Sequence, residues 1–376
     1  MRYKLLITST DLMMIQFLVP HVRYLLSREF DVEVACSEVG NRFNEVSDTL
    51  KNVPIHKVRS SRSPARISSI KGYIDIRKLL RVKKYDLIWT NEPVMGIITR
   101  LAARQARKKG TKVLYMTHGY HFYRGGLVKY KLFYPIEKFA SRFCDGIATI
   151  NYEDYELTKR KFYVEDVFHL NGIGLERKKF DVSFDTSAKR RELNLSDDDF
   201  IILSVGELKP HKNHQVIINA LSRIDRQGIV YLICGKGELL ESLTEQAKRL
   251  GVSEKVRFLG YRRDINEILH CADAFVFPSI REGLGLASLE AMSVGVPVIG
   301  ADTRGVVDYV KNGETGFLCQ MNNPQAYADA ITNLYDHPML RVELSKNCKD
   351  ASQKYDISII QIEIEQIICR LIGREK

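Results

Sequence analysis

Short apolar runs rich in β-branched residues alternate with amphipathic helical patterns along the whole chain. Six such runs fall in the first half and six in the second. They cover residues 3–9, 32–37, 85–91, 112–119, 146–151 and 166–173, and then 200–208, 229–237, 255–260, 274–279, 297–301 and 316–319. Strands that are apolar almost throughout and alternate with helices are typical of parallel sheets covered on both faces. The pattern therefore predicts an α/β protein with two doubly wound, Rossmann-like domains.

The length of 376 residues agrees with two domains, because it is long for a single core. The polar stretch 174–199 is the predicted linker. The first 20 residues resemble a signal peptide only weakly, since Asp11 interrupts the apolar run and no small-residue cleavage site follows. We interpret them as a buried strand followed by a loop. No run of 18 uncharged apolar residues occurs, so we expect no membrane-spanning helix.

Charge is distributed unevenly. Residues 1–180 hold 33 Lys and Arg against 18 Asp and Glu, and within them residues 51–150 hold 22 basic against 5 acidic side chains. This excess indicates an anionic partner, either a nucleic acid or an anionic membrane surface, although a merely solvated basic face gives the same counts. No nucleic-acid-binding module accompanies it. The seven scattered cysteines, never in a C-x-x-C pair, predict reduced thiols rather than disulfides or a zinc site.

Ligands of open α/β sheets bind beyond the carboxyl ends of the strands, so polar residues that follow strands are the candidate site residues. In SVGELKPHKNH (204–214), Lys209 and Lys212 precede a helix with Asn213 as the expected cap. Lysines at such a place bind phosphate or are ordinary solvated loop residues. ICGKGE (233–238) lacks the third glycine of a dinucleotide fingerprint and predicts a tight turn instead.

A pair of glutamates stands in the stretch REGLGLASLEAM, residues 281–292. Gly283 and Gly285 allow backbone amides to approach a ligand, and the N-terminus of a helix follows them. Glu290 has only small or apolar residues three and four positions away along that helix. Its carboxylate therefore needs hydrogen-bond donors, which either a ligand diol such as a ribose or a more distant Arg or Lys would supply.

TKVLYMTHGYHFYRGG (111–126) places His118, His121, Tyr123 and Arg124 directly after a strand. Histidines in such loops are candidates for function, and either one could instead make only a hydrogen bond that stabilises the loop.

Taken together, these motifs resemble the retaining GT-B glycosyltransferases, specifically glycosyltransferase family 4. The E-x7-E spacing of Glu282 and Glu290 carries the resemblance. VGELKPHKN, CGKGE, VRFLGYRRDINEIL, DAFVFPSIREGLGLASLEAM, GVPVIG and NGETGFL follow in the family's order over residues 200–320. The resemblance is looser over 1–175, where THGYHFYRGG is similar to the histidine loop of members that build bacterial surface polysaccharides.

The resemblance implies an acceptor-binding domain of residues 1–175 that is joined by a C-terminal crossover helix within 356–376. It also implies a nucleotide-sugar-binding domain of residues 176–355, with the active site between the two. Glu290 would hold the ribose hydroxyls, Glu282 the transferred sugar, and Lys212 the diphosphate. The implied catalytic residues are His118, Glu282 and Lys212. The implied donor-binding residues are Glu290, Gly206, Glu207, Lys209, Arg262, Gly283, Leu284, Gly285, Leu286 and Arg304, and the acceptor side has His121, Tyr123 and Arg124.

Two features depart from the family. Glu207 stands where the family often has an Arg that binds the diphosphate, so the phosphate charge would fall on Lys212, Lys209, Arg124 or Arg304. The first loop often carries a Gly-Gly pair, and here it reads STDLMM, residues 9–14.

The activity implied is transfer of a sugar from a nucleotide sugar, above all a UDP-sugar, to an acceptor hydroxyl with retained configuration. The acceptor would be a lipid-linked saccharide of capsule or exopolysaccharide synthesis. The basic first half would then hold a cytoplasmic protein on the inner face of the cell membrane. We expect neither a metal nor another cofactor. The alternative is a nucleotide-sugar epimerase or hydrolase on the same twin-Rossmann fold, and a silent partner subunit is disfavoured because the expected site residues are all present.

Overall fold

A computed structural model describes residues 2–38, 48–61, 67–122, 132–182 and 185–374. The chain divides into two compact units. Unit 1 comprises Met1–Gly174 and Ser358–Lys376, and unit 2 comprises Leu175–Ile357. Each unit contains one parallel sheet, so the predicted α/β fold with two doubly wound sheets is confirmed.

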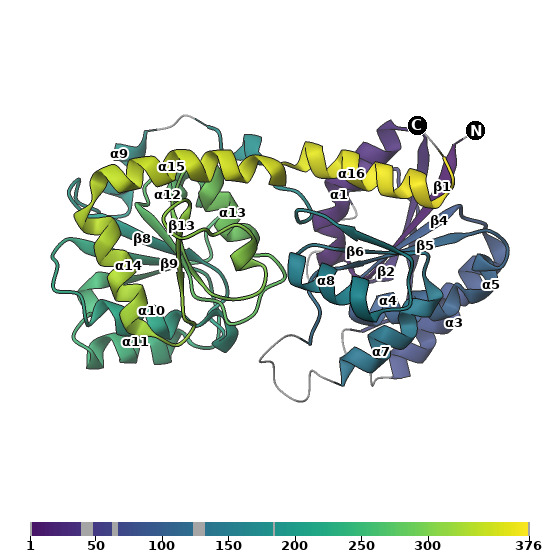
Figure 1. Cartoon of the computed structure of the whole chain (residues 1–376), viewed down its shortest axis with the longest axis horizontal. Coiled ribbons are helices and arrows are strands. Elements are labelled where there is room, and N and C mark those ends of the chain that lie inside the picture. Colours follow the sequence, from purple (N-terminus) through teal and green to yellow (C-terminus); the bar gives the residue numbers. More distant parts are fainter. Residues whose placement is uncertain (1, 39–47, 62–66, 123–131, 183–184, 375–376) are drawn as a thin grey trace. The chain divides into compact units, whose positions relative to one another are not determined.

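The sheet of unit 1 has seven strands in the order β3-β2-β1-β4-β5-β6-β7, all paired in parallel. Its strands are β1 (Tyr3–Asp11), β2 (Phe30–Ser37), β3 (Ile55–Lys57), β4 (Leu87–Asn91), β5 (Lys112–Thr117), β6 (Gly146–Thr149) and β7 (Asp166–His169). Its helices include α1 (Leu12–Ser27), α3 (Ile67–Val82), α4 (Pro93–Ala102), α5 (Arg104–Arg107), α7 (Phe133–Ala140), α8 (Tyr152–Lys161) and α16 (Ile357–Leu371). Figure 1 shows α1 and α16 on one side of this sheet and α3, α4 and α7 on the other.

The sheet of unit 2 has six parallel strands in the order β10-β9-β8-β11-β12-β13. They are β8 (Phe200–Val205), β9 (Ile229–Cys234), β10 (Val256–Gly260), β11 (Ala274–Phe277), β12 (Val298–Ala301) and β13 (Gly316–Cys319). The helices are α9 (Thr186–Glu192), α10 (His214–Leu221), α11 (Leu240–Arg249), α12 (Ile265–Leu269), α13 (Leu286–Ser293), α14 (Pro324–Asp336) and α15 (Pro338–Ser352). Side chains of β8, β9, α10 and α14 form one continuous apolar core.

All twelve runs predicted as strands contain a strand, and the structure adds β3. β3 was not predicted, because its three residues, Ile55, His56 and Lys57, do not form an apolar run. The loop expected after the first strand is wrong, since α1 begins directly at Leu12 and contains Pro20. Proline removes one backbone donor from a helix, but Ile15 and Leu18 are fully buried, and α1 packs on β1 and β2.

The segment expected as a linker, 174–199, contains helix α9, and all of it after Gly174 belongs to unit 2. The last helix, α16, packs within unit 1. The carboxylate of Glu365 accepts a hydrogen bond from the Tyr24 hydroxyl at 2.7 Å and pairs with Arg28 at 3.2 Å. None of the helices in the described part of the chain is long and apolar enough to cross a membrane.

Candidate functional site

Three neighbouring strands of unit 2, β8, β11 and β12, end at the same edge of the sheet, because all pairings are parallel. The predicted donor-site residues follow these strands. Gly206 to Lys212 come after β8, Glu282 to Leu286 come after β11, and Arg304 comes after β12. A backbone hydrogen bond from Ile280 N–H to His211 O, at 2.8 Å, joins the first two loops. The fold thus brings residues from three separate motifs to one edge.

Lys212 and Glu282 form an ion pair across these loops, with 2.6 Å between Nζ and Oε1. Their side chains are only 18 and 15% exposed, so solvent screens the pair less than it would a surface pair. The Lys212 ammonium also lies 5.1 Å from the ring centroid of Phe277, which ends β11. An anionic ligand that reaches Lys212 must therefore compete with Glu282 for the ammonium.

The loop from Glu282 to Leu286 turns sharply into α13. Gly285 has φ +96, and a Cβ there would lie 2.6 Å from the Phe277 ring, so only glycine fits. The loop after β12 packs against it, because a Cβ on Gly305 would lie 2.6 Å from the carbonyl oxygen of Gly283. The buried Arg304 donates from Nε to the carbonyl oxygen of Glu282 at 3.4 Å. A guanidinium and the N-terminus of an α-helix thus flank one glycine loop, an arrangement suited to an anion.

Glu290 lies in the second turn of α13. In the described residues its carboxylate has no hydrogen bond or ion pair, and only its backbone carbonyl accepts one, from Ser293 Oγ at 2.7 Å. Part of the side chain remains open to solvent, but the surrounding protein desolvates the carboxylate and raises its pKa to about 7, against a small opposing effect of Lys179. The lack of nearby donors expected from the helical spacing is therefore observed, and it leaves acceptor capacity for a ligand.

Glu207 and Lys209 neutralise each other, with the Lys209 ammonium 2.9 Å from both carboxylate oxygens. This ion pair limits the ability of Lys209 to bind phosphate. Asn213 is the N-cap residue of α10, as expected, but its side chain makes no cap hydrogen bond and donates instead to the carbonyl oxygen of Met321 at 2.9 Å. The second glycine motif serves packing, because a Cβ on Gly235 would lie 1.8 Å from the carbonyl oxygen of Gly206.

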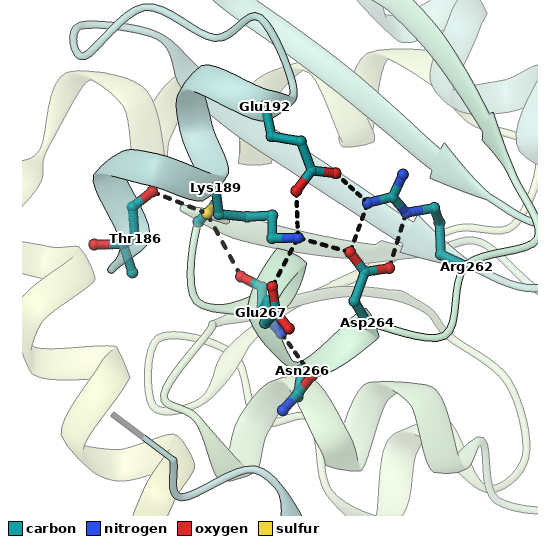
Figure 2. Close-up of polar contacts among 8 residues, drawn as sticks. Thr186, Lys189, Glu192, Arg262, Asp264, Asn266 and Glu267 are labelled. Atoms are coloured by element: carbon teal, nitrogen blue, oxygen red, sulfur yellow. Dashed lines mark hydrogen bonds and ion pairs between the residues drawn. The ribbon is translucent and has the colours of Figure 1, made fainter. Parts of the chain in front are cut away.

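Arg262, expected on the donor side, is held in an ion network (Figure 2). Its guanidinium binds Glu192 at 2.7 Å and Asp264 through two hydrogen bonds, and the same two carboxylates bind Lys189. Glu267 completes the partners of Lys189 at 2.7 Å. Burial alone would raise the pKa of Asp264, but hydrogen bonds from Arg262 and Lys189 lower it to about 2. The network joins α9 to the loop that follows β10.

His118 lies at the corresponding carboxyl edge of unit 1, directly after β5. Its Nε2 donates to the Asn91 Oδ1 at 3.0 Å, because the Asn91 Nδ2 already donates to the Thr8 carbonyl oxygen. Nδ1 of the neutral ring is then an acceptor. Burial, with a smaller effect of His21, lowers the pKa of His118 to about 4, so the ring is neutral at pH 7.

Two polar residues, Asn91 and Glu92, were not predicted from the sequence, although Asn91 ends β4 and Glu92 follows it directly. Glu92 has φ +62, which is uncommon for a residue other than glycine. Its carboxylate accepts hydrogen bonds from Ser9 Oγ and Thr10 N–H, both at 2.7 Å. Burial raises its pKa. The polar letters N-E-P after the run LIWT were the available signal. The Glu92 carboxylate thus holds the end of β1 next to the end of β4, where Asn91 contacts His118.

The structure places His121 with its ring 5.4 Å from that of Phe133, whereas Tyr123 and Arg124 lie outside the described residues. In the part of the chain that is described, no three His, Cys, Asp or Glu side chains gather as metal ligands would. The need for a metal stays untested.

Known proteins are similar to this chain in both units. A family described as "Glycosyl transferases group 1" matches residues 185–354, and one described as "Glycosyl transferase 4-like" matches residues 5–151. EpsD of Bacillus subtilis (strain 168), named as a glycosyltransferase, is 32% identical over 345 residues, which cover 90% of this chain and 89% of that protein. The UDP-Gal:alpha-D-GlcNAc-diphosphoundecaprenol alpha-1,3-galactosyltransferase of Escherichia coli is 31% identical, over 87% of this chain and 85% of its own.

A solved structure has a similar fold over nearly the whole chain. The crystal structure of Anabaena Alr3699/HepE in complex with UDP and glucose matches with a TM-score of 0.81 at 20% identity, covering 98% of this chain and 100% of the other.

Proposed function

We propose that this chain, which belongs to the GT-B glycosyltransferases of family 4, moves a sugar from a UDP-sugar to an acceptor hydroxyl and retains the anomeric configuration. The observation that carries the donor assignment is Glu290. It is a desolvated carboxylate on the helix that follows the glycine loop, and it has no donor among the residues that the structure describes. A ribose would supply the two hydroxyl donors that it lacks.

The leaving diphosphate would lie at the glycine loop of unit 2. As the bond between the anomeric carbon and the diphosphate oxygen breaks, negative charge develops on the diphosphate. Lys212, Arg304 and the N-terminus of α13, which flank the glycine loop, would stabilise that charge. Glu282 holds Lys212 in place before the donor arrives and then accepts hydrogen bonds from hydroxyls of the transferred sugar.

The acceptor oxygen would attack from the face that the diphosphate leaves. The new bond forms between that oxygen and the anomeric carbon, and the acceptor proton passes to the departing phosphate oxygen. No carboxylate nucleophile and no metal are needed in this scheme. His118 would orient the donor sugar through its neutral Nδ1, since a ring with a pKa of about 4 is a hydrogen-bond acceptor at pH 7.

The acceptor would be a lipid-linked saccharide of bacterial surface-polysaccharide synthesis. The likeness to a galactosyltransferase whose name includes a diphosphoundecaprenol supports this class, as does the basic excess of the first half. The protein would then work at the inner face of the cell membrane as a peripheral protein.

Release of nucleotide from a panel of UDP-, GDP- and dTDP-sugars tests the proposal, with and without a lipid pyrophosphate saccharide and in the presence of EDTA. We expect release from a UDP-sugar that depends on the acceptor and survives EDTA. Glu290→Ala should weaken UDP binding, and His118→Ala should lower kcat more than it weakens UDP binding. Equal turnover without acceptor would favour a hydrolase or epimerase, and unchanged turnover in both variants would refute the site.

A further inference from the structure

Two helices on one side of the sheet in unit 1 expose apolar side chains to solvent. α3 and α7 both pack against α4 and lie on the same side of the seven-stranded sheet (Figure 1). On α7 and the residue before it, Leu132, Ile136 and Phe139 are 68, 47 and 51% exposed. On α3, Ile70 and Ile74 are 63 and 40% exposed. Large exposed side chains spaced three or four residues apart form an apolar stripe, which marks an interaction surface.

Cations accompany the exposed side chains of α7. The Arg142 guanidinium lies 4.2 Å from the ring centroid of Tyr163, and the Lys138 ammonium lies 5.1 Å from it. Arg104 lies 4.8 Å from the ring of Phe143. In the described residues, none of these three cations has a carboxylate partner. Aromatic rings hold them in place without cancelling their charge.

The inward-facing arginines of the same region are neutralised. Arg100 pairs with Glu137 at 2.6 Å in the interior, and Arg107 pairs with Asp145 at 2.9 Å. Glu137 of α7 and the nearby Asp145 are therefore already paired with other arginines than those of the outer side.

The outer side of α3 repeats the combination. Lys71 lies between the two exposed isoleucines, and Lys78 and Arg81 follow one and two turns after Ile74. All three cations are exposed, and within the described chain they have no ion pair. The acidic residue of this helix, Asp75, is held by Arg59 at 2.6 Å. Both helices thus present apolar side chains among uncompensated cations.

We propose that this surface docks on an anionic lipid bilayer. We name it the α3–α7 face, and it consists of Ile70, Lys71, Ile74, Lys78, Arg81, Arg104, Leu132, Ile136, Lys138, Phe139, Arg142 and Tyr163. Its apolar side chains would enter the boundary between headgroups and acyl chains, and its cations would lie among the lipid phosphates. A second copy of the chain fits this surface less well, because its cations would face the same cations. A nucleic acid also fits less well, because it would leave the aliphatic side chains exposed to water. The inference deepens the proposed function by naming the surface that brings the protein to a lipid-linked acceptor.

Vesicle sedimentation tests the surface without any donor or acceptor. The full chain is mixed at low ionic strength with vesicles of phosphatidylcholine alone or with added phosphatidylglycerol. We expect binding only with phosphatidylglycerol, and weaker binding at high salt. Ile136→Glu with Phe139→Glu should weaken binding more than tenfold. Lys138→Ala with Arg142→Ala should weaken it about 25-fold, at about fivefold for each cation near the surface.

A matched control comes from α15 in unit 2, where Met339 and Val342 are 78 and 64% exposed. Met339→Glu with Val342→Glu should leave vesicle binding unchanged. Equal loss in this control, equal binding to phosphatidylcholine, or no binding by the unaltered protein would overturn the proposal. A change of oligomeric state on Ile136→Glu with Phe139→Glu, measured without vesicles, would show a contact between copies and would also overturn it.

UDP affinity of the same variants separates this inference from the proposed function. All of the altered side chains lie outside the donor site, so UDP binding should be unchanged in solution. If the unaltered protein binds vesicles through the α3–α7 face but never binds UDP, the surface stands and the proposed donor site fails.

Discussion

Glu290→Gln should stabilise unit 2 relative to the unaltered protein, and this stabilisation should be larger at pH 8 than at pH 5. The carboxylate has a pKa of about 7 in the folded chain, against an ordinary value of 4.5. An acid whose folded pKa is raised has its full stability below the unfolded pKa and loses stability as the pH rises through the folded one. A glutamine of nearly the same shape has no such dependence.

The magnitude follows from the two pKa values. Each pH unit between them corresponds to about 1.4 kcal/mol of unfolding free energy, which gives about 3 kcal/mol in total. Part of this stability difference is already present at pH 5, because the carboxyl of the unfolded chain is then largely ionised. The partial exposure of the side chain reduces the difference further. We therefore expect the advantage of the glutamine to grow by about 2 kcal/mol between pH 5 and pH 8, or about 4–8 °C in Tm for a unit of this size.

Thermal unfolding of both proteins at pH 5 and pH 8 measures this difference. Glu245→Gln on α11 is the matched control, since Glu245 is exposed in the same unit, and it should show no such growth. UDP titrations extend the experiment. A ribose that binds the ionised carboxylate should bind more weakly below pH 7 in the unaltered protein, and Glu290→Gln should remove that dependence. A difference in Tm that is identical at both pH values would refute the desolvation of Glu290.

Three further changes test other parts of the structure. Lys212→Ala should weaken UDP binding at least tenfold in isothermal titration and should leave Glu282 without its 2.6 Å partner; unchanged affinity would contradict the phosphate role. Arg100→Met should cost about 3–5 kcal/mol in denaturant unfolding, because Glu137 would remain buried and charged, and adding Glu137→Leu should restore part of it. Gly235→Ala should destabilise unit 2 by more than about 2 kcal/mol, since overpacking against backbone cannot relax through a side chain; an unchanged Tm would contradict the close approach.

The positions of the strands along the chain and the lack of donors around Glu290 could be predicted from the sequence, because both depend on local spacing. It could not show the Lys212–Glu282 pair, whose members stand 70 residues apart and meet only because β8 and β11 are neighbours. Nor could it show that Arg262 is held by Glu192 and Asp264. These ion pairs depend on which strands and loops are neighbours in the fold. The spacing of residues within one motif does not show which strands and loops are neighbours.

The Lys212–Glu282 pair also affects how an inhibitor should be designed. A compound that offers only an anion would take the ammonium from the carboxylate and leave Glu282 partly buried without a counterion. A compound that carries, beside its anionic group, a hydroxyl pair or an amine placed for Glu282 would satisfy both members at once. Affinity should therefore rise more from adding that second group than from adding further negative charge.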